Sequence, residues 1–282
     1  MKLGLLQFAP VLGDIDGNLA KADLLLHDAQ AKAGDFSLLL FPEMIVTGYV
    51  FESRDQVEAI VDAAEKAALD WAMRTSQRFN CSVQIGTPRR ASQTSLRNSI
   101  LLIDINNQQQ QQTPLFYDKH FLYTTDEIWA DEGPNFTTTS LQLLKPPRAP
   151  TTIALGICMD INPYRFESPF EKFEFATFHR NSSADLLSCS MAWVLSPDED
   201  LPRDKRTPLM GTINYWATRM TPVILAKEKR VIMAVCNRTG GENGTDFCGS
   251  SCVLAFENGG AKLLGVLGYT EEGLLVVDTD RD

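Results

Sequence analysis

The chain has 282 residues, 44% of them hydrophobic, which is enough to bury the core of one large α/β domain spanning residues 1–282. Its formal net charge of −10 argues against nucleic acid or an anionic membrane as the main partner, because both need clustered lysines and arginines. Six cysteines without a C-x-x-C pair, and only three histidines, make a metal site unexpected, and we expect no cofactor.

The start of the chain predicts a strand rather than a signal peptide. Gln7 and Pro10 interrupt the apolar pattern before a long hydrophobic segment develops. Without a secretory signal the thiols should stay reduced, so we expect a cytoplasmic protein. No apolar segment reaches membrane-spanning length.

Strand-like and helix-like segments alternate along the chain, which favours a layered α/β domain with helices outside mixed sheets. In chain order we expect a strand at 3–8, a helix at 18–32, a strand at 38–41, a long helix at 56–79, strands at 82–86, 97–103, 114–117, 152–157 and 186–189, a helix at 210–219, and strands at 231–236, 251–257, 262–267 and 273–278. The polar run 106–112 is expected to be a solvated hairpin loop, and 257–260 a turn leading to the last two strands.

Three chemically active residues each follow a predicted strand. Cys158 comes directly after the apolar segment 151–157 and before a turn-rich stretch, while Glu43 and Lys119 follow two other strand-like segments. A lone cysteine is more often a buried, inert thiol. A thiol, a carboxylate and an ammonium at three strand ends instead suggest one converging site.

The surroundings of these residues resemble the Glu, Lys and Cys motifs of the nitrilase superfamily. The motifs are 41–43 with 47–49, 117–120 and 156–160, and the segments 237–240 and 249–251 are similar to two later motifs. Within the superfamily, the segments 156–166, 191–193, 214–216 and 240–247 most resemble fungal protein N-terminal asparagine amidohydrolases. The resemblance implies a four-layer α-β-β-α sandwich with two mixed sheets, deamidation of Asn, and of Gln, at the first position of a polypeptide, and a role in the N-degron pathway.

The resemblance also implies roles for these side chains. Glu43 would take the thiol proton of Cys158, and Lys119 with the backbone N–H of Met159 would stabilise the oxyanion formed from the amide. Glu127, eight residues after Lys119, would orient Lys119 or the substrate. Glu132 is the alternative for that position, because the segment between the two glutamates is irregular.

The substrate-binding residues are predicted less directly. Asp160 is a candidate partner for the free ammonium of the substrate, and its alternative role is in turn structure. Trp193 and Tyr49 are candidates to line the pocket, although Trp193 could equally be a core aromatic. Residues 161–164 separate Asp160 from Arg165 and Phe166, a longer loop than the common superfamily pattern and similar to the N-terminal amidase branch.

Two other functions remain open at this stage. One is a small-molecule ω-amidase, carbamoyl amidase or nitrile hydrolase of the same superfamily. The other is a catalytically silent binding module, which the intact set of Glu43, Lys119 and Cys158 disfavours. The expected partner is a polypeptide N-terminus, and we expect a monomer or weak homodimer, because a dimer built through a C-terminal tail is not supported.

Overall fold

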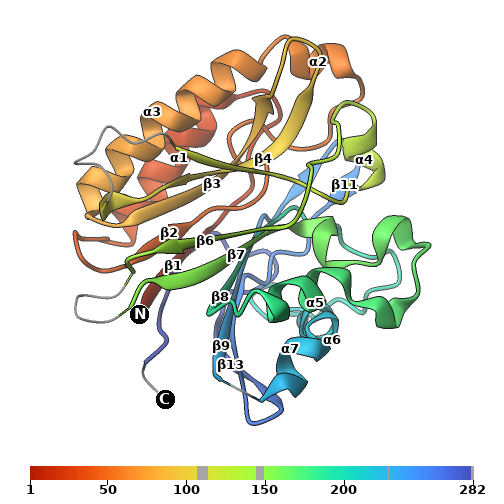
Figure 1. Ribbon diagram of the computed structural model, residues 1–282. Coiled ribbons are helices and arrows are strands. Elements are labelled where there is room, and N and C mark those ends of the chain that lie inside the picture. The colour runs from red at the N-terminus through yellow and green to blue at the C-terminus, as the bar shows by residue number, and fades with distance from the viewer. Residues whose placement is uncertain (107–113, 144–148, 228, 281–282) are drawn as a thin grey trace.

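Mixed β-sheets pack face to face, and helices cover their outer faces (Figure 1). The computed structural model describes residues 1–106, 114–143, 149–227 and 229–280, and within these ranges it has two sheets of six strands. The first sheet runs, in spatial order, β14 (Gly273–Asp278), β1 (Lys2–Gln7), β2 (Leu38–Leu40), β3 (Ser82–Arg90), β4 (Leu96–Ile103) and β5 (Leu115–Asp118). The second runs β13 (Gly260–Val266), β12 (Cys252–Glu257), β9 (Val231–Asn237), β8 (Leu186–Met191), β7 (Thr151–Ile157) and β6 (Thr137–Leu141). A small hairpin, β10 (Gly241–Glu242) with β11 (Thr245–Asp246), lies between β9 and β12 in the chain.

The helices form two outer layers. In Figure 1, α1 (Ile15–Asp28) and α3 (Val61–Phe79) lie on the side of the first sheet, and α5 (Glu174–Asn181), α6 (Met210–Arg219) and α7 (Thr221–Ala226) on the side of the second. The shorter helices are α2 (Arg54–Glu58), α4 (Thr124–Glu127) and the 3₁₀ turns η2 (Cys158–Ile161), η3 (Tyr164–Phe166) and η4 (Phe170–Lys172). The predicted α-β-β-α sandwich is therefore confirmed. In the part of the chain that the structure describes, no helix is both long and apolar enough to span a bilayer.

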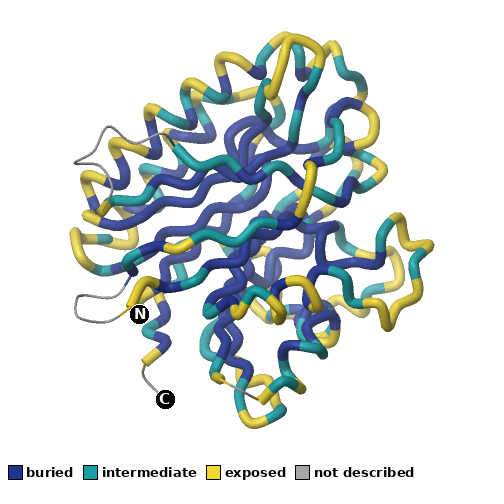
Figure 2. The backbone as a smooth tube through the Cα atoms, in the orientation of Figure 1, coloured by how far each residue is buried: buried dark blue, intermediate teal, exposed yellow. Residues whose placement is uncertain are grey.

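Strand periodicity explains why the layers hold together. Leu38 and Leu40 of β2 belong to the apolar cluster that includes residues of the second sheet, while Leu39 points the other way and packs with Trp71 of α3. Figure 2 shows the strands largely buried and the outward faces of the helices exposed. Sheets covered on both faces need apolar side chains on both, which accounts for the nearly continuous apolar composition of these strands.

Polar side chains also connect the two sheets. Gln84 of β3 donates a hydrogen bond to Ser190 of β8 (3.0 Å) and accepts one from Ser188 (2.7 Å). The hydroxyl of Ser190 donates in turn to the backbone oxygen of Phe41, just after β2 (2.7 Å). All of these groups are buried, so the bonds restrict how one sheet can slide over the other.

Several predicted elements differ from the structure. The long helix at 56–79 is two helices, because Ile60 adopts φ −124° and interrupts the helical path between α2 and α3. The first helix begins earlier than predicted, because the Asp14 carboxylate caps it by accepting from the N–H of Gly17 (3.0 Å). The turn at 257–260 joins β12 to β13, whereas β14 crosses to the first sheet and pairs antiparallel with β1. Of the predicted loop at 106–112, all but Asn106 lies outside the described residues.

Gly86 allows the segment carrying Glu43 to pass close over β3. A Cβ at position 86 would lie 2.5 Å from the backbone oxygen of Pro42, 2.6 Å from the nitrogen of Met44 and 2.7 Å from the Cα of Glu43. These atoms are backbone, so they cannot move aside as a flexible side chain could. The glycine therefore permits the close approach of β3 to the turn that presents Glu43.

We predict that Gly86→Ala lowers the free energy of unfolding by about 1–3 kcal/mol, because the added methyl overpacks a buried site. Gly273→Ala is the matched control, since a Cβ there meets no atom within 4 Å and the substitution should be nearly neutral. Urea denaturation of both variants against the parent measures the difference. Equal stabilities for the two variants would contradict the steric argument.

Candidate active site

Cys158 occupies a strained turn at the end of β7. Its φ of 39° lies in the left-handed region, which costs a non-glycine residue on the order of 1–3 kcal/mol. The turn directs the chain from β7 into η2. The residue is 8% exposed, compared with 0% for Glu43 and 1% for Lys119. Of these three groups the thiol is therefore the most accessible to a ligand.

Glu43 and Lys119 form a buried ion pair beside this turn. The ammonium nitrogen of Lys119 lies 2.7 Å from Oε1 of Glu43, and both side chains are inaccessible to solvent. The other carboxylate oxygen of Glu43 accepts a hydrogen bond from the backbone N–H of Ala192, just after β8 (2.7 Å). The same N–H also interacts with the Cys158 thiol. The three residues predicted to converge are therefore brought together, with Ala192 between carboxylate and sulfur.

The second carboxylate on Lys119 belongs to Asp126 and not to Glu127. The Lys119 ammonium donates a short hydrogen bond to Oδ2 of Asp126, whose side chain is fully buried in α4. Glu127 is the next residue on this single helical turn, so its carboxylate points outward, is 42% exposed and lies 3.7 Å from Arg165. The alternative, Glu132, accepts from the hydroxyl of Tyr164 (2.8 Å). The predicted contact of Glu127 with Lys119 is thus wrong by one residue.

Asn98, which joins the two carboxylates, has no recognisable motif around it. Its side-chain nitrogen donates to Oε1 of Glu43 (2.7 Å) and to Oδ1 of Asp126 (2.8 Å), and its backbone oxygen accepts from the N–H of Lys119 (2.8 Å). Asn98 lies within β4 between Arg97 and Ser99, and a polar residue in such a stretch is most simply interpreted as facing solvent. The carboxylate of Asp126 also accepts a hydrogen bond from the backbone N–H of Tyr123 (3.0 Å), in the manner of a helix cap.

The surroundings of Glu43, Lys119 and Cys158 raise all three pKa values, and this determines which of the groups is charged at neutral pH. Burial raises the pKa of Glu43, and the nearby Lys119 only partly opposes this. Burial would lower the pKa of Lys119, but the carboxylates of Asp126 and Glu43 outweigh it, so this pKa lies above its ordinary value. Burial, reinforced by the field of Glu43, raises the pKa of the Cys158 thiol well above its ordinary range. At neutral pH the resting thiol is therefore protonated, Lys119 is a cation, and Glu43 is the group suited to accept a proton.

Two residues predicted to contact substrate are engaged within the protein. The buried carboxylate of Asp160 accepts from the hydroxyl of Tyr117 (2.7 Å) and from the backbone N–H groups of Ile157 (2.8 Å), His120 (3.1 Å) and Phe121 (2.8 Å). It thereby fastens the Cys158 turn to the segment after Lys119, and this placement contradicts the predicted contact with a substrate ammonium. Burial raises the pKa of Asp160, although these hydrogen bonds act against the shift.

Tyr49 also supports the ion pair from within. Its hydroxyl donates to Oδ2 of Asp126 (3.1 Å), and the Lys119 nitrogen lies 5.6 Å from the centre of its ring. The side chain is 1% exposed, so it lies behind Lys119 rather than on an open pocket wall. The predicted pocket position of Tyr49 is replaced by this supporting contact.

The other two predicted contact residues keep positions compatible with ligand binding. Met159 directly follows the nucleophile candidate in η2, where its backbone N–H adjoins the thiol turn. Trp193 is partly exposed, and its ring centre lies 5.7 Å from that of Tyr215 and 5.8 Å from that of Trp216. Its backbone N–H donates to Asn237 at the end of β9 (2.8 Å). These contacts fix Trp193 immediately beyond Ala192.

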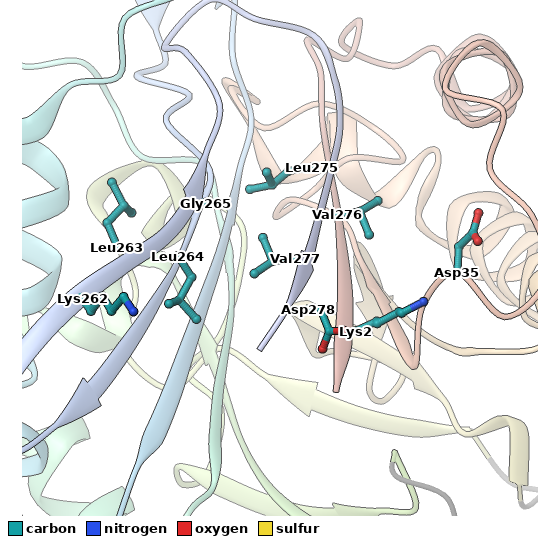
Figure 3. A pocket seen from close by; sticks show the side chains of 10 residues that line it. All are labelled: Lys2, Asp35, Lys262, Leu263, Leu264, Gly265, Leu275, Val276, Val277 and Asp278. Carbon is teal, nitrogen blue, oxygen red and sulfur yellow. The ribbon is translucent and has the colours of Figure 1, made fainter. Parts of the chain in front are cut away.

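Within the described ranges, no group of three or more His, Cys, Asp or Glu side chains is arranged to hold a metal ion. A groove of about 620 Å³ lies between β13 and β14 (Figure 3). Its lining consists of aliphatic side chains with Lys2, Asp35, Lys262 and Asp278. Because β1 and β2 run parallel, Lys2 and Asp35 lie at the strand ends opposite to the one that carries Glu43. The groove is therefore separate from the Cys158 site.

We predict that Asp126→Asn lowers the free energy of unfolding by about 1–3 kcal/mol: Glu43 remains as the counter-ion of Lys119, but the buried donors of Lys119, Tyr49 and Asn98 lose a charged acceptor. Glu127→Gln changes an exposed neighbour on the same helical turn and should alter stability by less than about 0.5 kcal/mol. Chemical denaturation of the two variants compares them directly. A larger loss for Glu127→Gln would restore the original sequence-based assignment.

Comparison with known proteins identifies the family of this arrangement. Residues 2–162 match the carbon-nitrogen hydrolase family. The chain is 34% identical to protein N-terminal amidase of Schizosaccharomyces pombe over the whole of both chains, and 30% identical to that of Saccharomyces cerevisiae over 70% of this chain and 45% of the relative. The fold superposes on the crystal structure of an N-terminal amidase with an Asn-Glu-Ala peptide with a TM-score of 0.83, at 22% identity, covering 98% of this chain and 96% of the other. The chain belongs to the carbon-nitrogen hydrolase family of the nitrilase superfamily, and is a hydrolase acting on amide bonds.

Proposed function

We propose that this protein is an amidohydrolase that converts Asn, and also Gln, at the N-terminus of a polypeptide to Asp or Glu with release of ammonia. The observation that carries the proposal is the buried group of Glu43 and Lys119 beside the strained Cys158 turn, in a chain 34% identical to a protein N-terminal amidase throughout. The domain is a single carbon-nitrogen hydrolase unit over residues 1–282. Neither a metal nor a cofactor takes part in the proposed reaction.

The proposed reaction begins with proton transfer from the thiol. Oε2 of Glu43, which shares the Ala192 N–H with the sulfur, accepts the proton of Cys158 as the sulfur attacks the side-chain amide carbon. Negative charge then develops on the amide oxygen. The ammonium of Lys119 and the N–H of Met159 stabilise this oxyanion, and both act in a buried site where such interactions are strong.

The intermediate then loses ammonia. Glu43 returns its proton to the departing nitrogen, the C–N bond breaks, and a thioester remains on Cys158. Glu43, again ionised, takes a proton from a water molecule that attacks the thioester. The second tetrahedral intermediate releases the carboxylic acid, and the proton held by Glu43 passes back to the sulfur. The net reaction consumes one amide and one water and yields one acid and one ammonia.

Lys119 is excluded as the base by its own surroundings. Its ammonium is held by two carboxylates, and its pKa lies above the ordinary value. Asp126 acts through Lys119 as a positioning residue, because it fixes the ammonium without facing the thiol directly. Glu127 has no part in the proposed reaction.

The substrate assignment rests on the relatives. Solved structures that share this fold include N-terminal amidases with an Asn-Glu-Ala peptide and with a Gln-Gly peptide, and these peptides begin with the two residues that we propose as substrates. We further propose that the protein is cytoplasmic, acts in the N-degron pathway and works as a monomer or weak homodimer. All six cysteines are unpaired, which fits a reducing compartment.

We predict that kcat/KM falls at low pH with an apparent pKa above 4.5, the ordinary value for glutamate, because burial raises the pKa of Glu43. Glu43 must be ionised to accept the thiol proton, so activity is present above its pKa and is lost as the pH falls through it. A pH profile of kcat/KM measures this. An acid limb at or below pH 4.5 would show that Glu43 is not the base.

A peptide assay tests the reaction itself. We expect peptides beginning with Asn or Gln to release ammonia and gain about one mass unit, while acetylated Asn peptides stay unchanged because they lack the free amino group. Cys158→Ala should abolish the reaction. Cys189→Ala is the matched control, because it removes another buried thiol, from within β8, and should retain activity.

The contrary results are distinct. Hydrolysis of free amide acids without hydrolysis of peptides would assign the protein to small-molecule amidases of the same family. Full activity of Cys158→Ala would exclude the proposed thioester. No turnover of any amide would leave a binding module.

A further inference from the structure

Arg238 and Glu242 form a second buried ion pair next to the catalytic group. The guanidinium of Arg238 lies 2.9 Å from Oε2 of Glu242, and the two side chains are 0% and 4% exposed. Arg238 follows β9, its guanidinium carbon lies 3.9 Å from the ring centre of Phe247, and one of its nitrogens donates to the oxygen of Pro10 (3.5 Å). Charged groups are rarely this deeply buried without a specific role.

Glu242 holds the turn that carries Tyr49. Its Oε1 accepts from the backbone N–H groups of Tyr49 (2.7 Å) and Val50 (2.5 Å). Gly48, just before them, has φ +77°, and a Cβ there would lie 2.6 Å from Oε2 of Glu242. The Glu242 carboxylate therefore occupies space that only a glycine at position 48 leaves open, so it is an integral part of this turn.

The turn leads directly to the reacting groups. The hydroxyl of Tyr49 donates to Asp126, which binds the ammonium of Lys119, and that ammonium binds Glu43. A displacement of the turn would thus be passed through two hydrogen bonds to the cation that faces the oxyanion. We infer that Arg238 and Glu242 are positioning residues for amide hydrolysis, which hold Tyr49 against Asp126 and present Glu43 with an internally neutralised pair of charges.

The charges that act on Glu43 come from several elements. They are Lys119 after β5, Asp126 in α4, the Cys158 thiol after β7 and Arg238 after β9, with Tyr49 on the same turn as Glu43. Burial lowers the pKa of Arg238 while Glu242 opposes this, and Glu43 and Tyr49 act in the same direction as Glu242. Arg238 remains charged at neutral pH, as arginine does in proteins. Its field at Glu43 is offset by Glu242 as long as the pair is intact.

The direction in which the pKa of Glu43 shifts in two variants distinguishes the proposed positioning role of Arg238 and Glu242 from a purely structural role. Glu242→Gln keeps the shape and an acceptor for the two N–H groups, but it leaves the Arg238 cation without its counter-charge, which lowers the pKa of Glu43. Arg238→Met removes the cation and leaves the negative charge of Glu242 unopposed, which raises the pKa of Glu43. Loss of packing alone has no reason to move a titration in opposite directions.

The test is the pH profile of kcat/KM with a peptide bearing N-terminal Asn. We expect the acid limb to move to lower pH in Glu242→Gln and to higher pH in Arg238→Met, each by about half a unit or more. In the double variant, where both charges are gone, the limb should lie between those of the two single variants. We also expect kcat to fall about tenfold to a hundredfold in the single variants with little change in KM, because Lys119 is misplaced.

Asp70→Asn is the matched control, since it breaks an exposed pair with Lys66 (2.6 Å) and should leave the limb unchanged. Glu242→Gln and Arg238→Met each test the inference separately, so if one variant fails to fold, the other still provides a test. A limb that does not move, or that moves the same way in both, overturns it. The inference rests on Glu43 as the base: a parent enzyme without peptide activity, or without an acid limb, rejects the proposed function instead.

Discussion

The ammonium of Lys119, held between two buried carboxylates, is the interaction on which the rest of the site depends. Glu43 and Asp126 are brought within a few ångströms of each other, and such neighbours repel unless a cation lies between them. Asn98 adds a neutral bridge to both carboxylates, so every charge in the group has partners despite its burial. This binding keeps Lys119 in the charged form, and in the proposed reaction Glu43 is the proton acceptor. The different roles of Lys119 and Glu43 follow from how the neighbouring charges balance one another, and not from residue type alone.

That group can form only if the two sheets keep one alignment, because Glu43 and Lys119 follow strands of the first sheet and Cys158 follows a strand of the second. Apolar side chains between the sheets provide most of the stabilisation, but contacts of this kind are not directional. The buried hydrogen bonds of Gln84 with Ser188 and Ser190 are directional, and each costs about 1–3 kcal/mol if it is left unmade. The apolar core thus holds the sheets together, while a few polar side chains select the alignment that brings sulfur to carboxylate.

The parts of this arrangement that the sequence predicts are those with a local signature. Strands appear as short apolar segments, and Cys158, Glu43 and Lys119 stand out because each directly follows one. Asp126 was missed because the choice between it and Glu127 is a matter of about 100° around a single helical turn, which no pattern in four residues determines. Asn98 and the N–H of Ala192 have no signature, since their roles arise only when strands of different sheets meet. The pairing of β14 with β1 was hidden for the same reason: it joins the two ends of the chain.

The raised pKa of the Cys158 thiol gives this site a further property. A thiolate is what reacts with oxidants and with stray electrophiles, so a thiol kept neutral by burial is protected while the site is empty. In the proposed reaction it becomes nucleophilic only as an amide carbon arrives and Glu43 removes its proton. The strained turn places Cys158 nearer to the surface than the other two residues, since it is 8% exposed while Glu43 and Lys119 are 0% and 1% exposed. In the proposed reaction the substrate amide therefore approaches from the side of Cys158, with its carbonyl oxygen directed inward to the buried ammonium of Lys119.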